Sequence, residues 1–151
     1  MKKGTLGIAL RYALLKSICK YCGDNVSVHE GVYLLEPQNL SIGNNVSIHP
    51  MCYIDATGEI EIGNDVSIAH ATTIMSSTHK FEDKNIPIKD QGIIKEKVII
   101  NDNVWVGAKV TILCGNSIAS GSVIGAGAVI THDTKENSVN VGVPAKAIKE
   151  R

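Results

Sequence analysis

The chain has 151 residues, which suits one compact domain, and its 15 Lys and Arg balance 15 Asp and Glu, so no general attraction to nucleic acid is expected. Aromatic residues are scarce at 4%, whereas Gly numbers 14 and branched aliphatic residues are frequent. This composition excludes a disordered chain and favours many short strands joined by tight turns. No apolar run approaches the roughly 20 residues needed to cross a bilayer.

Residues 1–21 form the first predicted element. Basic residues interrupt its apolar part and no A-x-A-like cleavage site follows, which argues against a signal peptide. Aliphatic residues recur at every fourth position, at Leu6, Leu10, Leu14 and Ile18. That spacing predicts a short amphipathic helix, which we expect to pack on its own domain. Binding of this basic helix to a membrane surface is the alternative.

The chain has four cysteines, at Cys19, Cys22, Cys52 and Cys114. The C-x-x-C spacing of the first two fits a metal or redox pair, but no second pair completes a zinc site. We therefore expect buried or half-buried free thiols in a reducing compartment, with the cytoplasm as the default location.

A six-residue repeat runs through the rest of the chain. Every sixth residue is aliphatic in the run Ile100, Val106, Ile112, Ile118, Ile124 and Ile130. Two earlier triplets have the same spacing: Ile42, Ile48 and Ile54, then Ile62, Ile68 and Ile74. Cys22, Val28 and Leu34 form a weaker first triplet. Six is the period of neither a strand nor a helix, but it fits a short strand plus a turn.

Three such units close a triangular coil of about 18 residues, and stacked coils pair their strands in parallel. CGDNVSVHE, IGNNVSIHP and IGNDVSIAH begin 20 residues apart, so these coils carry two extra residues, which we place at a corner near Gly58 and Glu59. We expect the Gly and Asn residues of GDN, GNN and GND to supply positive φ angles at other corners. The predicted fold is an all-β solenoid, a parallel β-helix, following a short N-terminal helix.

The hexapeptide pattern over residues 22–149 resembles the left-handed β-helix acyltransferase superfamily. The stretch NDNVWVGAKVTILCGNSIASGSVIGAGAVITHD, followed by GVPAKAIK, is similar to the C-terminal coils of that superfamily. The left hand is implied by the resemblance alone, because strand crossovers are normally right-handed. The chain is thus expected to be a single domain, with a helix over 1–21 and the β-helix and its C-terminal tail over 22–149.

The repeat breaks after Ile74, since Lys80 stands where an inward aliphatic residue is due and the frame resumes only at Ile100. We expect one loop, at about residues 77–98, to leave the coil there. A long loop inside a repetitive fold is usually functional or disordered. This one has apolar residues, among them Phe81 and Ile86, with which to dock on another surface.

His79 directly precedes this loop. Imidazole titrates near neutral pH and can accept a hydroxyl proton, although a surface histidine of no consequence is the alternative from position alone. The segment THKFEDKNIPIKDQG resembles the branch that acetylates sugars and polysaccharides, and this resemblance implies that His79 is the general base. It also implies acetyl-CoA as co-substrate, direct attack on its thioester and no nucleophilic Ser or Cys. Cys114 is not placed next to a histidine in any motif.

The resemblance also implies the coenzyme contacts, in a cleft between two copies of a homotrimer. Trp105 precedes an inward valine and so points outward, where relatives have the active-site cleft; plain interface packing is the alternative. His132 departs from the Thr-Lys pair of many relatives, which weakens its case as a phosphate contact. The expected coenzyme contacts are Trp105, Ala108, Ala126, Thr131, His132, Lys146 and Lys149.

The remaining histidines, His29, His49 and His70, fall on one edge of the predicted coil. Carbonic anhydrases on this helix bind zinc with an H-x-x-x-x-H spacing, which is absent here, so we expect no metal. His49 stands where similar sugar acetyltransferases often have an acceptor-binding Asn. We expect His49, and Asn85 of the loop, to contact the acceptor.

The predicted function is acetyl-CoA-dependent O-acetylation of a sugar or polysaccharide precursor. N-acetylation of an amino sugar stays open, because the base has the same task there. Acetylation of serine or a xenobiotic, a zinc enzyme resembling carbonic anhydrase, and a non-catalytic solenoid are further alternatives. No nucleic-acid partner and no membrane span are expected.

Overall fold

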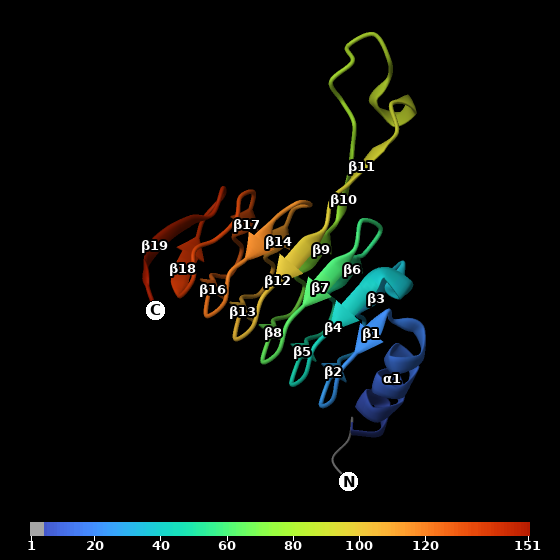
Figure 1. Ribbon diagram of the computed structural model, residues 1–151, viewed down its shortest axis with the longest axis vertical. Coiled ribbons are helices and arrows are strands. Elements are labelled where there is room, and N and C mark those ends of the chain that lie inside the picture. Colours follow the sequence, from blue (N-terminus) through green and yellow to red (C-terminus); the bar gives the residue numbers. More distant parts are fainter. Residues whose placement is uncertain (1–4) are drawn as a thin grey trace.

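The computed structural model describes residues 5–151 and shows three sheets wound into a left-handed β-helix, all parallel except for the antiparallel last strand (Figure 1). Sheet A contains β1 (Tyr21–Cys22), β4 (Leu40–Ile42), β7 (Ile60–Ile62), β12 (Val98–Ile100) and β15 (Ser117–Ile118). Sheet B contains β2 (Ser27–Val28), β5 (Ser47–Ile48), β8 (Ser67–Ile68), β13 (Trp105–Val106), β16 (Val123–Ile124), β18 (Ser138–Val141) and β19 (Lys146–Glu150). Sheet C contains β3 (Tyr33–Leu35), β6 (Tyr53–Asp55), β9 (Thr73–Met75), β14 (Thr111–Ile112) and β17 (Val129–Ile130).

The predicted aliphatic columns form the core. All six residues of the run from Ile100 to Ile130 are buried, as are the triplets that begin at Ile42 and Ile62. In the weaker first triplet Leu34 is only partly buried. Each strand is parallel to its equivalent one coil away, and Ile42 pairs with Ile62. The fold prediction is therefore confirmed.

The corners between sheets A and B correct one expectation. Asn25, Asn45 and Asp65 have φ of 56°, 57° and 57°, as expected for the left-handed region, but the preceding Gly43 is not among the positive-φ residues. A Cβ on Gly43 would lie 2.7 Å from the carbonyl carbon and oxygen of Gly63. Glycine is required there because stacked backbones touch, not because of its φ angle.

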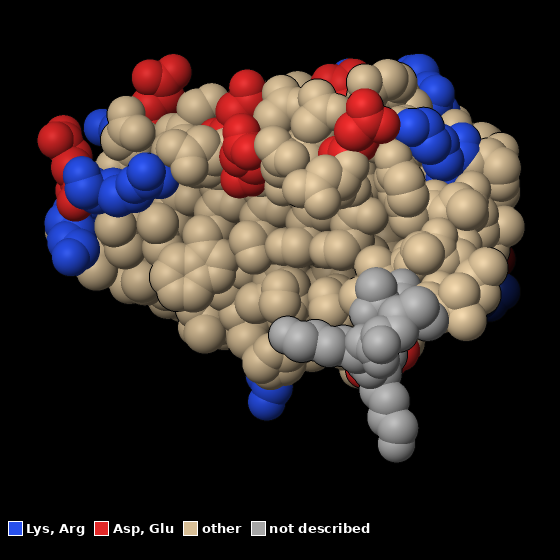
Figure 2. All heavy atoms as spheres, turned by 90° about the horizontal axis from the view of Figure 1, so that it is seen from below, with Lys and Arg blue, Asp and Glu red and all other residues tan. Residues whose placement is uncertain are grey.

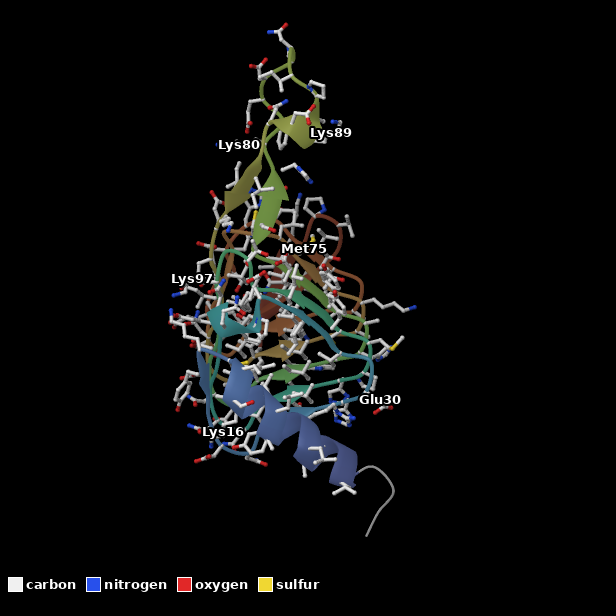
Figure 3. All side chains as sticks on the ribbon, turned by 90° about the vertical axis from the view of Figure 1, so that its right-hand side faces the viewer. Lys16, Glu30, Met75, Lys80, Lys89 and Lys97 are labelled. Atoms are coloured by element: carbon white, nitrogen blue, oxygen red, sulfur yellow. The ribbon has the colours of Figure 1, made fainter. Side chains whose placement is uncertain are left out.

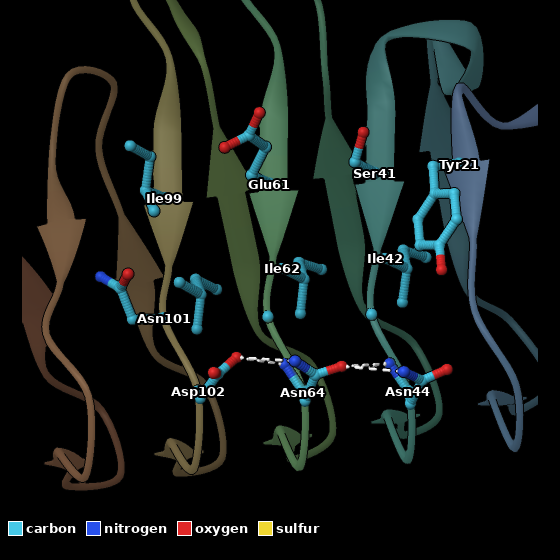
Figure 4. A pocket seen from close by; sticks show the side chains of 13 residues that line it. Tyr21, Ser41, Ile42, Asn44, Glu61, Ile62, Asn64, Ile99, Asn101 and Asp102 are labelled. Carbon is cyan, nitrogen blue, oxygen red and sulfur yellow. Dashed lines mark hydrogen bonds between the residues drawn. The ribbon is translucent and has the colours of Figure 1, made fainter.

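Side chains at these corners form a ladder along the coil axis. The Asn44 backbone N–H donates to Oδ1 of Asn64 (2.9 Å), whose own N–H donates to Oδ1 of Asp102 (2.6 Å), as Figure 4 shows. A hollow of about 490 Å³ lies beside the ladder on sheet A. No histidine lines this hollow, and the ladder already engages much of its polar lining, so it offers no evident chemistry.

The helix α1 (Thr5–Ile18) packs on its own domain as expected, but through a different side from the predicted stripe. Leu15 is 2% exposed in the core, and Nε of Arg11 donates to the carbonyl of Val28 at 2.7 Å. Leu10, in the predicted apolar stripe, is 63% exposed, and Leu6, Leu14 and Ile18 are exposed with it. Periodicity shows which residues share a side of a helix, not which side docks. Residues 1–4 of the expected N-terminal element lie outside the described part.

The two extra residues lie where sheet C leads into sheet A, as predicted. The first coil has a short 3-10 helix, η1 (Pro37–Asn39), at this corner, and the second has a turn around Gly58. The third coil sends out the hairpin of β10 (Ser77–His79) and β11 (Ile93–Lys95), with the 3-10 helix η2 (Ile88–Asp90) between them. The predicted loop is thus a structured hairpin that projects away from the coil (Figure 1). None of the helices in residues 5–151 is long and apolar enough to span a membrane.

Candidate active site

A cavity of about 380 Å³ lies at the root of the hairpin. It is lined by Met75, Ser77, Thr78, His79, Leu113, Cys114, Asn116 and Thr131. Figure 3 shows Met75 at the level where the hairpin leaves the coil, with Lys80 and Lys89 farther out along it. The cavity is smaller than the hollow on sheet A, but it contains a histidine and a thiol. We therefore take this cavity as the candidate active site.

His79 ends β10 and pairs with Ile93 across the hairpin. The side chain is exposed at the cavity wall. Within residues 5–151 no hydrogen bond joins its imidazole to another side chain, so both ring nitrogens are open to an incoming ligand. Lys80, the residue that replaces the expected aliphatic, donates its backbone N–H to the carbonyl of Gly92 at 3.1 Å. The repeat breaks here because the chain turns outward into a hairpin.

Cys114 lines the same cavity as His79, although no sequence motif places it next to a histidine. Burial and the nearby carboxylate of Glu96 raise the pKa of the Cys114 thiol. The thiol is therefore protonated at neutral pH and poorly suited to act as a nucleophile. The two residues are 35 positions apart, so only coil stacking brings them together. All four cysteines are free and buried or half-buried, as predicted.

Thr131 and His132 lie on the His79 side of the coil. Thr131 lines the cavity, and its Oγ1 is 2.8 Å from Nδ1 of His132. Met75, Ser77, Leu113 and Asn116 also line the cavity, and sequence reasoning missed all of them. Repeat positions alone could have found Met75 and Leu113, since both follow an inward isoleucine on sheet C.

The other expected coenzyme residues, called the Trp105 group below, gather around sheet B. They are Trp105, Ala108, Ala126, Lys146 and Lys149. Trp105 is 57% exposed on β13, and Ala108 and Ala126 lie at the corner that follows this sheet. The corners stack closely, since a Cβ on Gly107 would lie 2.7 Å from the backbone nitrogen of Ala126. Lys146 and Lys149 are exposed on β19, the strand that ends the same sheet.

The outer surface of sheet B is uncharged along the strands from β2 to β16, and charged residues return only on β19. Figure 2 shows a broad surface free of charged side chains, with Lys, Arg, Asp and Glu along its edges. The outward residues of β2, β5, β8, β13 and β16 are uncharged, namely Ser27, Ser47, Ser67, Trp105 and Val123. His79 lies elsewhere, between sheets C and A. One chain therefore presents two separate groups of expected site residues.

His29 and His49 stack with ring centroids 5.0 Å apart, at the corner after sheet B. Burial and the nearby His29 and His70 lower the pKa of His49, so its imidazole is neutral at pH 7. Within residues 5–151 no three His, Cys, Asp or Glu side chains are arranged to hold a metal ion. His49 thus lies with the Trp105 group, not with His79.

Asn85 lies in the outer part of the hairpin, where its backbone N–H donates to Oδ1 of Asp83 at 2.8 Å. Apolar residues are exposed around it, including Phe81 at 62% and Ile88 at 55%. This part projects away from the coil of the same chain (Figure 1).

No family model and no curated relative matches the chain. Solved structures do match. A hexapeptide-repeat-containing acetyltransferase from Vibrio cholerae is 25% identical, with a TM-score of 0.87 over 97% of this chain and 82% of that one. The same enzyme has been solved with acetyl-CoA.

A maltose O-acetyltransferase from Clostridium difficile 630 is 28% identical, with a TM-score of 0.81 over 99% of this chain and 78% of that one. An N-acyltransferase from Bacillus cereus, solved with an amino-sugar nucleotide and coenzyme A, shares the fold at 24% identity, with a TM-score of 0.75 over 93% of this chain and 89% of that one. The likeness to the Vibrio and Clostridium acetyltransferases confirms the resemblance to hexapeptide-repeat acetyltransferases, whereas the N-acyltransferase shows the shared fold alone.

Proposed function

We propose that this chain, a hexapeptide-repeat acyltransferase, transfers the acetyl group of acetyl-CoA to a hydroxyl of a sugar or polysaccharide precursor, with His79 as general base. The observation that carries the proposal is the imidazole of His79 at the wall of a cavity where a hairpin interrupts the hexapeptide coil. Support comes from the likeness to two acetyltransferases, one of which acts on maltose.

In the proposed reaction, His79 removes the proton from the acceptor hydroxyl as its oxygen attacks the thioester carbon. The tetrahedral intermediate then collapses, the C–S bond breaks, and the imidazolium returns the proton to the coenzyme A thiolate. A free ring nitrogen on His79 suits this role. The raised pKa of Cys114 favours direct transfer over an acyl-enzyme.

We place coenzyme A against the Trp105 group. The exposed indole offers a flat apolar surface, and the small residues Ala108 and Ala126 leave room for a narrow chain. Lys146 and Lys149 supply positive charge for the nucleotide phosphates. Thr131 and His132, expected in the same role, lie beside His79 and would meet the thioester end.

Because His79 and Trp105 lie on different sides of one chain, we propose that each active site joins His79 of one copy to Trp105 of a neighbour in a homotrimer. The uncharged part of sheet B, from β2 to β16, suits contact with another copy (Figure 2). The projecting hairpin exposes Phe81 and Ile88, apolar residues with which it would contact that copy. His49 and Asn85 would then meet the acceptor from different copies.

The test is steady-state release of coenzyme A thiol with sugar and amino-sugar acceptors. His79→Ala should lower turnover by roughly 10²- to 10⁴-fold, the usual contribution of a positioned base. Stability should change by less than about 0.5 kcal/mol, because the side chain is exposed. His29→Ala, a histidine outside the cavity, is the matched control and should stay near the parental turnover.

Near-parental turnover of His79→Ala would refute the assignment of the base. Preference for an amine over a hydroxyl acceptor would favour the N-acetylation alternative. Thermal unfolding with acetyl-CoA and, separately, with zinc distinguishes the other classes. A ligand at a hundredfold excess over its Kd stabilises by about 2.7 kcal/mol, so a shift with zinc alone would favour the metalloenzyme.

A further inference from the structure

We propose that Asp55 is a positioning residue for His79, holding the root of the hairpin through Ser77 so that the imidazole enters the cavity in one orientation. The inference rests on the proposed function, because it assigns His79 as the base. It adds a residue that no sequence motif indicated.

Asp55 ends β6, in the coil just before the one that sends out the hairpin. It is only 8% exposed. The parallel ladder pairs Asp55 with Leu35 on one side and Met75 on the other. Its neighbours on the two adjacent coils are thus apolar, and its carboxylate lies one coil before the hairpin. A buried carboxylate is unfavourable unless donors surround it, so its presence here needs a local explanation.

The carboxylate joins the corner turn to the hairpin. Oδ1 of Asp55 accepts hydrogen bonds from the backbone N–H of Thr57, at 2.9 Å, and from the Thr57 hydroxyl. Oδ2 accepts one from the hydroxyl of Ser77 at 2.8 Å. Bonds to an ionised acceptor are stronger than neutral ones. Ser77 is the first residue of β10 and lies two positions before His79.

The backbone of the same residue holds Ser76. The carbonyl of Asp55 accepts the Ser76 N–H at 3.0 Å and the Ser76 hydroxyl at 2.7 Å. The Ser76 hydroxyl in turn accepts the N–H of Gly58 at 2.8 Å. Both residues that lead into β10 are therefore attached to Asp55, one through its backbone and one through its side chain.

Ser77 and His79 line the same cavity, as expected for residues two apart on a strand. Because the Ser77 hydroxyl donates its proton to Asp55, its oxygen can only accept hydrogen bonds from other groups. Removing the carboxylate frees this hydroxyl and loosens the strand that carries the base. A displacement of about 1 Å at a catalytic group can lower turnover about 100-fold.

Burial alone would raise the pKa of Asp55, but the hydrogen bonds from Thr57 and Ser77 and the charge of Lys95 outweigh it and hold the pKa below its usual value. The carboxylate is thus ionised at neutral pH. This agrees with a role as acceptor for donors, and argues against a proton donor in the reaction.

The experiment compares Ser77→Ala and Asp55→Asn with the parent in acetyl transfer. Both should lower kcat about 10- to 100-fold with little change in the KM for acetyl-CoA, because the Trp105 group is untouched. Ser77→Thr keeps the hydroxyl and should restore most of the loss. Thr57→Ala removes a turn bond to the same carboxylate but not the link to the hairpin, and should stay near the parental kcat.

A second measurement does not need activity. Hydrogen exchange of the β10 amides should become faster in Ser77→Ala and Asp55→Asn and stay parental in Thr57→Ala. If His79→Ala is inactive but Ser77→Ala and Asp55→Asn keep the parental kcat, the inference is wrong while the proposed function stands. If the parent shows no acetyl transfer, the proposed function fails, and unchanged exchange would overturn the role of Asp55 at the hairpin root as well.

Discussion

A mixed trimer made of two different inactive chains should recover activity. In the first chain His79→Ala removes the base, and in the second Trp105→Ala removes the exposed indole. Loss of the base alone should lower turnover by a factor of roughly 10² to 10⁴. Truncating a central Trp typically costs about 2 kcal/mol or more of binding, which raises the KM for acetyl-CoA about thirtyfold.

The expected recovery follows from the placement of the two residues. His79 lies between sheets C and A, and Trp105 lies on sheet B, so each proposed site takes one residue from each of two neighbours. A cyclic trimer has three sites, each made by His79 of one chain and Trp105 of the next. When both kinds of chain are present, whichever is in excess, one of these three sites has both residues intact. Turnover should therefore be about one third of the parental value at low acetyl-CoA.

The assay uses two affinity tags, one on each variant, and purification over both in sequence, so that every trimer contains both chains. Thiol release is measured at an acetyl-CoA concentration well below the KM of the Trp105→Ala homotrimer. The parent with both tags is the positive control, and the two homotrimers are the negative controls.

Two results would refute the reasoning. Mixed trimers no more active than either homotrimer would mean that both residues serve a site within one chain, or that Trp105 does not bind the coenzyme. A stable, active monomer at micromolar concentration in equilibrium sedimentation would remove the shared site altogether.

Gly43→Ala should lower the free energy of unfolding by about 1–3 kcal/mol in urea titration, since the new Cβ meets the backbone of Gly63; an unchanged midpoint would contradict the close stacking. Asp55 should contribute to stability above its unfolded pKa of about 3.9, and this contribution should be lost as pH falls through its lower folded pKa. Asp55→Asn should therefore show a shallower loss of stability than the parent between about pH 5 and 2, and parallel curves would show that the carboxyl is not perturbed.

Much of the fold could be predicted from the sequence because burial in a coil is periodic. Ile100, Val106 and Ile112 had to face inward once the six-residue repeat was recognised, and they do. His79 could be singled out because it stands where that period fails. The exit of the hairpin and the corner of the 20-residue coils followed from the same frame.

The sequence alone did not determine what depends on contacts between coils. Leu10 and the other residues of the predicted apolar stripe are exposed because Leu15 and Arg11 attach α1 to the coil by a different side. The spacing of apolar residues does not say which side of a helix will dock. Gly43 is needed for an approach between backbones 20 residues apart. Cys114 shares a cavity with His79, and Asp55 bonds to Ser77, only because stacking places consecutive coils in contact. The repeat thus determined which side chains face inward, and the stacked coils decided which outward side chains meet.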